Sequence, residues 1–275
     1  MTAPTGLAGT TALVTGGAAG LGRAIAQAYL AAGANVVICD VDRDRLDAAT
    51  SEWGGSSSSP SRFLAVQADV SSESSVSGLI AAALSAFPSL DVVVNNAGIM
   101  DRFDPVGACP KSLWDSVLSV NLTGPYLVSK AAINHWESAA AAAAPGPGSL
   151  SGIIVNIGSN ASFMGMSAGA AYTASKHGIL ALTKNTAGFY GAKGIYSMAL
   201  LLGGMDATKI ADAFVEGMNQ EAWAKINAVH PGFVPEKTGV PLADVAKYVL
   251  FLSDRGVAAS ANGSCIPFNK NWPEA

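Results

Sequence analysis

Short apolar runs alternate with helical stretches along the whole sequence. The apolar runs are typical of buried strands, and they fall at 11–16, 35–40, 63–70, 90–98, 152–159 and 194–202. Helical spacing of apolar residues covers 21–32, 43–53, 74–87, 111–144 and 171–190. From 241 onward the pattern predicts a helix and then a last strand at NGSCIPF. Alternation of this kind predicts βαβ units and an α/β fold with an open, doubly wound parallel sheet, covered by helices on both faces.

Two polar linkers interrupt this alternation without dividing it. GGSSSSPS at 54–61 and PGPGSLSG at 145–152 both lie between elements of one continuous series. We therefore expect a single domain over 1–275.

The composition narrows the class of protein. Half of the residues are hydrophobic and 13% are charged, which suits a parallel sheet that is buried on both faces. A net charge of -4 argues against a nucleic-acid partner or an anionic membrane, which favour a basic face. No apolar run has transmembrane length, and the first residues lack the pattern of a signal peptide, so we expect a cytoplasmic protein. The three cysteines and three histidines are scattered, so neither a disulfide framework nor a metal site is expected.

A glycine-rich string, TGGAAGLG at 15–22, follows the first strand and opens the first helix. Such a turn lets backbone N–H groups approach a pyrophosphate, and the helix N-terminus favours the anion. Gly16, Gly20 and Gly22 stand where side chains would crowd the turn most. Because a strand precedes this string and a helix follows it, the sequence predicts a dinucleotide-binding site.

The second strand ends at Asp40, 18 residues beyond Gly22. This is the distance expected of a carboxylate that accepts hydrogen bonds from a ribose diol and repels a 2′-phosphate. No lysine or arginine lies in the glycine turn, and Val41 follows Asp40, so NAD is favoured over NADP. The alternative is that Asp40 only begins a turn or caps the next helix.

Several strings occur in an order that is specific to one family. They are TGGAAGLG, Asp69-Val70, NNAG at 95–98, Asn121 in SVNLTG, Ser159 in VNIGS, and YTASK at 172–176. Together they resemble the short-chain dehydrogenase/reductase family over about the first two hundred residues. The resemblance implies a Rossmann-type fold and a nicotinamide-dependent oxidoreductase.

The residues of these strings also indicate acid/base chemistry. Tyr172 and Lys176 are i and i+4 on one predicted helix, so their side chains project from the same face. A neighbouring ammonium stabilises a phenolate, so we expect Lys176 to lower the pKa of Tyr172 and make it an acid/base group. Ser159 ends the fifth strand, where open α/β sheets bind ligands, and its hydroxyl would hold the substrate oxygen. His177 points off this face and is not expected to be the base.

The resemblance implies further roles. Lys176 would touch the nicotinamide ribose, and Asn121 would support a water leading to Lys176. The other residues implied along the cofactor are Leu21, Val41, Asp69, Val70, Asn96, Ala97 and Gly98, with Asn96 also tying the fourth strand to its neighbours.

One segment departs from the family pattern. After the sixth strand the family has a Pro-Gly turn, whereas this chain reads LLGGMDAT with Leu202 in place of the proline. Gly204, Met205 and Thr208 still match and would meet the nicotinamide carboxamide. A second string, HPGFVPEKTG at 230–239, is the alternative for this turn. Because a helical pattern precedes it, we interpret it as the return from a substrate lid at about 203–240.

The substrate itself is less constrained by the sequence. Apolar side chains in the lid and after Ser159 favour a bulky hydrophobic substrate over a sugar; they are Met205, Phe214, Met218, Trp223 and Phe233, with Phe163, Met164 and Met166. The alternative is that they only pack the lid onto the body. The main interpretation is an NAD-dependent enzyme acting on a secondary alcohol or ketone. The alternatives are a redox-neutral use of the same site or, from another class, a nucleotide-binding regulatory protein. The family resemblance also implies a homodimer or homotetramer.

Overall fold

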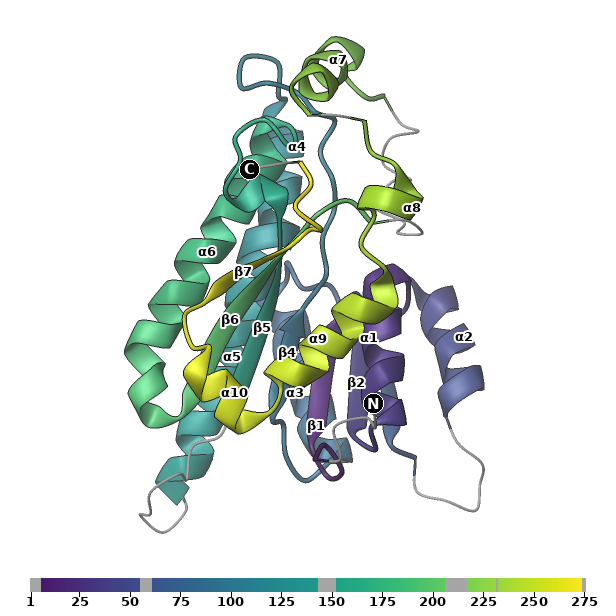
Figure 1. Cartoon of the computed structure of the whole chain (residues 1–275). Helices are drawn as coiled ribbons and strands as arrows, with labels where there is room; N and C mark the ends of the chain where they lie inside the picture. The colour runs from purple at the N-terminus through teal and green to yellow at the C-terminus, as the bar shows by residue number, and fades with distance from the viewer. Residues whose placement is uncertain (1–5, 55–60, 143–151, 206–216, 231, 274–275) are drawn as a thin grey trace.

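A single parallel sheet organises the chain. The computed structural model describes residues 6–54, 61–142, 152–205, 217–230 and 232–273. Seven strands pair in the order β3-β2-β1-β4-β5-β6-β7 (Figure 1). They are β1 (Thr11–Thr15), β2 (Asn35–Asp40), β3 (Phe63–Gln67), β4 (Val92–Asn95), β5 (Gly152–Ser159), β6 (Ile195–Leu202) and β7 (Cys265–Phe268). The strand order changes direction between β1 and β4, so the predicted doubly wound sheet is confirmed.

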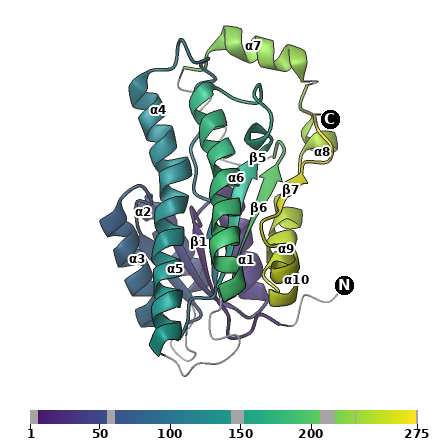
Figure 2. The same ribbon diagram turned by 90° about the vertical axis from the view of Figure 1, so that its left-hand side faces the viewer.

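Helices cover both faces of the sheet (Figures 1 and 2). One face carries α1 (Gly20–Ala31), α2 (Arg43–Trp53), α9 (Leu242–Leu252) and α10 (Arg255–Ser260). The other face carries α3 (Glu73–Ala86), α5 (Gly124–Ala142) and α6 (Ala170–Tyr190), with α4 (Lys111–Leu118) beside the start of α6. Beyond the carboxyl ends of the strands lie α7 (Gln220–Val229) and α8 (Pro235–Thr238).

The core consists of apolar strands between these two layers. In β1, Ala12 and Val14 pack toward α1 and α9, and Leu13 packs toward α3 and α5. All three are fully buried. Burying a large aliphatic side chain stabilises a fold by about 1.5–3 kcal/mol, which explains why these strands have no polar face. The sheet that results holds the loops at the carboxyl ends of its strands in place.

Three predicted elements differ in their limits. The helix predicted over 111–144 is interrupted by a π-helical segment, Ser119–Thr123, between α4 and α5. The strand predicted over 63–70 ends at Gln67, because its last partner, Asp40, is also the last residue of β2. The helical pattern that precedes HPGFVPEKTG is present among the described residues as α7, which begins at Gln220.

Candidate active site

A cleft of about 1160 Å³ lies at the carboxyl ends of the strands. Fifteen of the residues predicted for the site line it: Gly16, Gly20, Leu21, Asp40, Val41, Asp69, Val70, Asn96, Ala97, Gly98, Ser159, Tyr172, Lys176, Gly204 and Met205. Gly22 and Asn121 are not among its lining residues, and Thr208 lies outside the described part of the chain. The cleft thus brings the predicted cofactor and catalytic residues together at the place where open α/β sheets bind ligands.

The glycine turn at one end of the cleft is closely packed. Gly16 and Gly20 have φ angles of 61° and 50°, a conformation that favours glycine. A Cβ at Gly22 would lie 2.2 Å from the Gly16 carbonyl oxygen, so a side chain there would force α1 away from the turn. The Asn96 Nδ2 donates hydrogen bonds to the carbonyl oxygens of Thr15, at 2.9 Å, and Gly16, at 3.3 Å. Asn96 therefore links the end of β4 to the end of β1, as predicted.

Asp40 lies in the cleft at the end of β2. One of its oxygens accepts the Asp42 N–H at 3.2 Å, but the cap of α2 is Asp42, which accepts the Arg45 N–H at 3.1 Å. The alternative that Asp40 caps the next helix is therefore wrong, whereas its contact with the following turn is real. Sequence reasoning missed Arg45, which lines the same end of the cleft and pairs through Nε with the Asp42 carboxylate at 2.8 Å.

Ser159, Tyr172 and Lys176 meet on one wall of the cleft. Ser159 is the last residue of β5, and its backbone is held by the hydroxyl of Ser162, which accepts the Ser159 N–H at 3.1 Å. Tyr172 lies in the first turn of α6. Lys176, one turn later, donates from Nζ to the Ile157 carbonyl oxygen at 2.9 Å, and this Nζ lies 5.5 Å from the centroid of the Tyr172 ring. The predicted i, i+4 pairing of Tyr172 and Lys176 is therefore present. β5 carries Ser159 and, through the Ile157 carbonyl oxygen, also holds Lys176.

Burial controls the protonation of this group. It raises the pKa of Tyr172 to about 12, while a hydrogen bond from Ser159 lowers it and the negative charge of Asp101 raises it further. Burial also lowers the pKa of Lys176 to about 8. The expectation of a lowered phenol pKa is wrong for this structure, because loss of water around the ring outweighs the nearby amine. At neutral pH the phenol is protonated and is ready to donate.

Asn121 supports the site from behind the cleft wall. Its Oδ1 accepts the Ile99 N–H and its Nδ2 donates to the Ile99 carbonyl oxygen, both at 2.8 Å. The π-helical segment turns this buried side chain toward the loop after β4. A Cβ at Gly98 would lie 3.3 Å from the Asn121 Oδ1 and 3.8 Å from the Lys176 Nζ, so the three residues are neighbours. The observed bonds show a structural tie; the predicted role of Asn121 in holding a water remains a prediction.

The turn that follows β6 lies in LLGGM, and not in the alternative HPGFVPEKTG. Leu202 is buried at the end of β6, and Gly203, Gly204 and Met205 follow it into the cleft. The Val240 N–H donates to the Gly204 carbonyl oxygen at 2.9 Å, which returns the chain from the lid. HPGFVPEKTG follows α7 rather than a strand, as interpreted from the sequence.

Lid residues form the outer wall of the cleft. Trp223 and Phe233 line it as predicted, together with Ile226, Asn227 and His230. Met218 instead packs with Phe103 and α4, and Phe163, Met164 and Met166 are not among the lining residues, because the loop after Ser159 turns toward solvent. Phe214 lies outside the described residues.

Several lining residues were missed in the sequence. Besides Arg45, they include Met100 and Phe103 of the loop after β4 and Trp272 and Pro273 near the C-terminus. Asn160 holds the tail in place, since its Nδ2 donates to the Trp272 carbonyl oxygen at 2.8 Å. No short-range pattern brings these segments to the site; only the position of Met100 and Phe103 just after NNAG pointed toward it.

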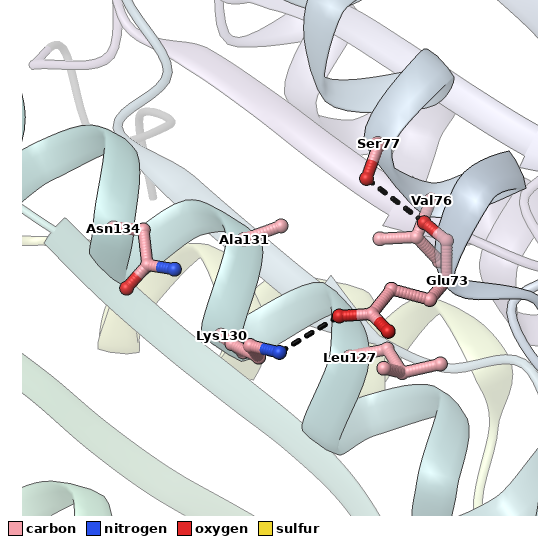
Figure 3. Close-up of a pocket in the computed structure, with 7 residues that line it drawn as sticks. All are labelled: Glu73, Val76, Ser77, Leu127, Lys130, Ala131 and Asn134. Carbon is pink, nitrogen blue, oxygen red and sulfur yellow. Dashed lines mark hydrogen bonds and ion pairs between the residues drawn. The ribbon is translucent and has the colours of Figure 1, made fainter.

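A second, much smaller hollow of about 120 Å³ lies between α3 and α5 (Figure 3). Its polar feature is an ion pair between Lys130 Nζ and Glu73 Oε1 at 2.7 Å, and both side chains are substantially exposed. Exposed pairs of this kind contribute little to stability, because water screens both charges, and they offer no reactive group. The chemistry is therefore placed in the large cleft.

Two other features are absent from the described residues. Among them, no helix is both long enough and apolar enough to span a bilayer. The same residues contain no group of three or more His, Cys, Asp or Glu side chains placed to hold a metal ion.

Comparison with known proteins matches this arrangement to one family. Residues 10–219 match the family model described as short chain dehydrogenase. The chain is 44% identical to the short chain dehydrogenase/reductase dpchG of Colletotrichum higginsianum, over 98% of this chain and 95% of that one. It is 31% identical to 3beta-hydroxysteroid dehydrogenase 2 of Eggerthella lenta, over 97% and 95%. The crystal structure of levodione reductase superposes with a TM-score of 0.79 at 27% identity, over 96% and 98%. The chain belongs to the short-chain dehydrogenase/reductase family of oxidoreductases, and the doubly wound sheet with its cleft is the Rossmann-type fold of that family.

Proposed function

We propose that the enzyme transfers a hydride between NAD(H) and a secondary alcohol or ketone of a bulky hydrophobic metabolite. The observation that carries this proposal is the convergence of Ser159, Tyr172 and Lys176 on the wall of a cleft whose other end holds the glycine turn and Asp40. Hydride transfer to a ketone needs a proton donor for the developing alkoxide. A protonated phenol with a hydroxyl beside it meets that need.

The cleft fits a dinucleotide. The turn from Thr15 to Gly22 packs closely against the loop after β4, since a Cβ at Gly16 would lie 3.0 Å from the Ala97 Cα. Backbone N–H groups of this turn and the N-terminus of α1 would hold the pyrophosphate. Asp40 would hold the adenine ribose diol, and Gly204 and Met205 would lie along the nicotinamide. When bound, the nicotinamide supplies the carbon that accepts or donates the hydride.

The protein's own residues move the proton. In reduction, Ser159 donates a hydrogen bond to the carbonyl oxygen, and Tyr172 gives its proton to that oxygen as the carbon receives the hydride. The resulting phenolate is stabilised by the Ser159 hydroxyl and by the Lys176 amine. In oxidation the same phenolate takes the proton from the alcohol. Because burial raises the pKa of Tyr172 to about 12, the phenol is protonated at neutral pH and can serve as the proton donor in reduction.

A redox-neutral reaction on the same three residues is the second candidate, since dehydration and epimerisation also need an acid/base group beside a carbonyl. The absorbance of reduced nicotinamide separates the two during turnover of a panel of secondary alcohols and ketones. Stoichiometric consumption of the reduced cofactor with product formation supports hydride transfer to the substrate. Product formed at constant absorbance would contradict it. A regulatory protein would need no such acid/base group, so we do not favour that alternative.

The outer wall of the cleft favours a large apolar substrate. The rings of Phe103 and Trp223 meet edge to face with centroids 4.8 Å apart, and those of Phe233 and Trp272 lie 5.4 Å apart. All four residues line the cleft. Aromatic side chains provide broad contact to rings and alkyl groups, with few polar positions. One relative reported above is named a 3beta-hydroxysteroid dehydrogenase, and a hydroxysteroid is a secondary alcohol of this large, apolar kind.

Trp223→Ala tests this wall. We expect kcat/KM for large apolar ketones to fall by about tenfold or more, because a large buried contact is worth roughly 1.5–3 kcal/mol, with a much smaller loss for small secondary alcohols. Binding of the cofactor should not change. Val229→Ala in the same helix is the matched control, since Val229 is exposed and is not among the lining residues. Equal losses for large and small substrates would show that Trp223 only packs the lid.

We also propose that the enzyme is a homodimer or homotetramer that pairs through α5 and α6. These two helices lie side by side on the outside of the molecule (Figure 2). Tyr126 on α5 and Phe189 on α6 expose 46% and 72% of their surface, and a second copy of the chain packed on these helices would cover them. Light scattering at micromolar concentration should give at least twice the mass of 27.7 kDa. A monomer would contradict this proposal.

A further inference from the structure

Asp101 lies three residues beyond Gly98, which lines the cleft, and it is almost fully buried, with 2% of its surface exposed. Its carboxylate accepts three backbone N–H groups. Oδ1 accepts those of Phe103 at 3.0 Å and Gly169 at 3.1 Å, and Oδ2 accepts that of Tyr172 at 2.9 Å. A buried charge is costly unless its oxygens are hydrogen-bonded, and here two of the three donors belong to the start of α6. The residue therefore binds the backbone of the proposed acid/base group itself.

The chain makes room for this carboxylate. A Cβ at Gly169 would lie 2.5 Å from the Asp101 Oδ2, so any larger residue there would displace the carboxylate from the helix. Phe103, whose N–H the carboxylate accepts, has a φ of 62°, a strained angle for a residue with a side chain. Strain at a non-glycine residue persists only where its surroundings hold it, and the buried carboxylate supplies part of that restraint.

The same loop also holds the lid. The Asp104 carbonyl oxygen accepts the Ala170 N–H at 2.9 Å, while the Asp104 Oδ1 accepts from the Asn219 Nδ2 at 3.0 Å. Asn219 caps α7, which carries Trp223. Residues 101–104 thus join the first turn of α6 to the start of the lid helix.

We propose that Asp101 is a positioning residue for the reaction, whose buried carboxylate fixes the first turn of α6 and so holds the Tyr172 hydroxyl against Ser159 and the substrate oxygen. This role rests on the function proposed above. Asp101 is not among the residues that line the cleft, so it acts through Tyr172 and not on substrate or cofactor.

The charge of Asp101 gives this role an observable signature. Its negative charge raises the pKa of Tyr172, and burial raises the pKa of Asp101 itself. The other titratable groups that face the pair are Asp104 and Cys109 of the same loop and Lys176 of α6. On the adjoining helices, Lys111 pairs with Asp115 on α4 and Lys225 with Glu221 on α7, all of them well exposed. Removing the Asp101 charge should therefore lower the pH at which Tyr172 ionises.

Asp101→Asn keeps the shape and removes the charge and one acceptor. With NADH at saturation and a ketone as substrate, we expect the plateau kcat near neutral pH to fall by about tenfold or more, since small misplacements of a catalytic group are costly. The midpoint of the alkaline limb of the pH–kcat profile should move to lower pH. The affinity for NAD should not change. Asp91→Asn is the matched control, because Asp91 also accepts a backbone N–H, that of Thr11 at 2.8 Å, but at the amino ends of the central strands β1 and β4, away from the cleft. An unchanged midpoint, or a plateau loss no larger than that of the control, would overturn the proposal.

Two further measurements keep the test independent of the first variant's folding and of the proposed reaction. Gly169→Ala retains the charge but crowds the carboxylate, and it should lower kcat at unchanged NAD affinity; native turnover would overturn the proposal. Carbon-13 NMR of labelled tyrosine, with Tyr172 assigned by loss of its signal in Tyr172→Phe, follows ionisation of the phenol without any turnover. The Tyr172 signal should begin to shift at lower pH in Asp101→Asn. An unshifted onset would overturn the role of Asp101, whatever reaction the enzyme performs.

Discussion

Replacing Tyr172 with phenylalanine should lower turnover at least about 10²-fold and leave cofactor binding intact. The substitution removes one oxygen atom from a side chain that is 7% exposed and keeps the ring that packs against Phe103, Val117 and Ile226. The fold should therefore survive while the proton donor is lost. Steady-state kinetics on the preferred ketone, together with fluorescence titration of the reduced cofactor, measures the two effects separately.

Tyr190→Phe is a matched control on the same helix. Tyr190 also lies close to a lysine, with the Lys193 Nζ 5.1 Å from its ring centroid, against 5.5 Å for Lys176 and Tyr172. Tyr190 is the last residue of α6, at the end of the helix remote from Tyr172. It packs against the core beneath α3 and α5 and does not line the cleft. Removing its hydroxyl should leave turnover within about twofold of the native rate. Near-native turnover in Tyr172→Phe would instead refute the assignment of the acid/base group and with it the proposed mechanism.

This pair of tyrosines also shows which parts of the site a sequence predicts well. Spacing of three or four residues on a helix fixes which side chains share a face, so the approach of Tyr172 to Lys176 follows from local geometry. The glycine turn and Asp40 follow in the same way, because the turn joins consecutive elements. Protonation does not follow. The expected lowering of the phenol pKa considered the nearby amine alone, whereas burial by distant segments controls the result.

Residues supplied by distant segments escaped prediction for the same reason. Asp101 sits in an irregular loop, and nothing in IMDRF indicates that its carboxylate reaches α6, 68 residues away. Trp272 reaches the cleft through a contact with Asn160, 112 residues earlier. The π-helical segment that contains Asn121 also looks like ordinary helix in the sequence, because it is a single wide turn inside the helical pattern predicted over 111–144.

The enzyme should bind NADH about 10²-fold more tightly than NADPH. Asp40 ends β2 inside the cleft, where its carboxylate can accept hydrogen bonds from a ribose diol, and hydrogen bonds to a charged group contribute about 1.5–3 kcal/mol. A 2′-phosphate would replace them with repulsion between two anions. Arg45 acts in the opposite direction, since it lines the same end of the cleft, but its guanidinium is already paired with Asp42 at 2.8 Å. We therefore expect the carboxylate to decide the preference.

Fluorescence titrations with both reduced cofactors test this balance on the native enzyme and on Asp40→Asn. The variant removes the charge at the ribose and should bring the two affinities within about tenfold, mainly by strengthening NADPH, because Arg45 then faces the phosphate unopposed by Asp40. Asp47→Asn is the control: it removes the same charge from α2, where Asp47 pairs with Arg43 at 3.0 Å outside the cleft, and it should leave the ratio unchanged. Equal affinities in the native enzyme, or a preference for NADPH, would show that Arg45 outweighs Asp40 and that the cofactor is NADP.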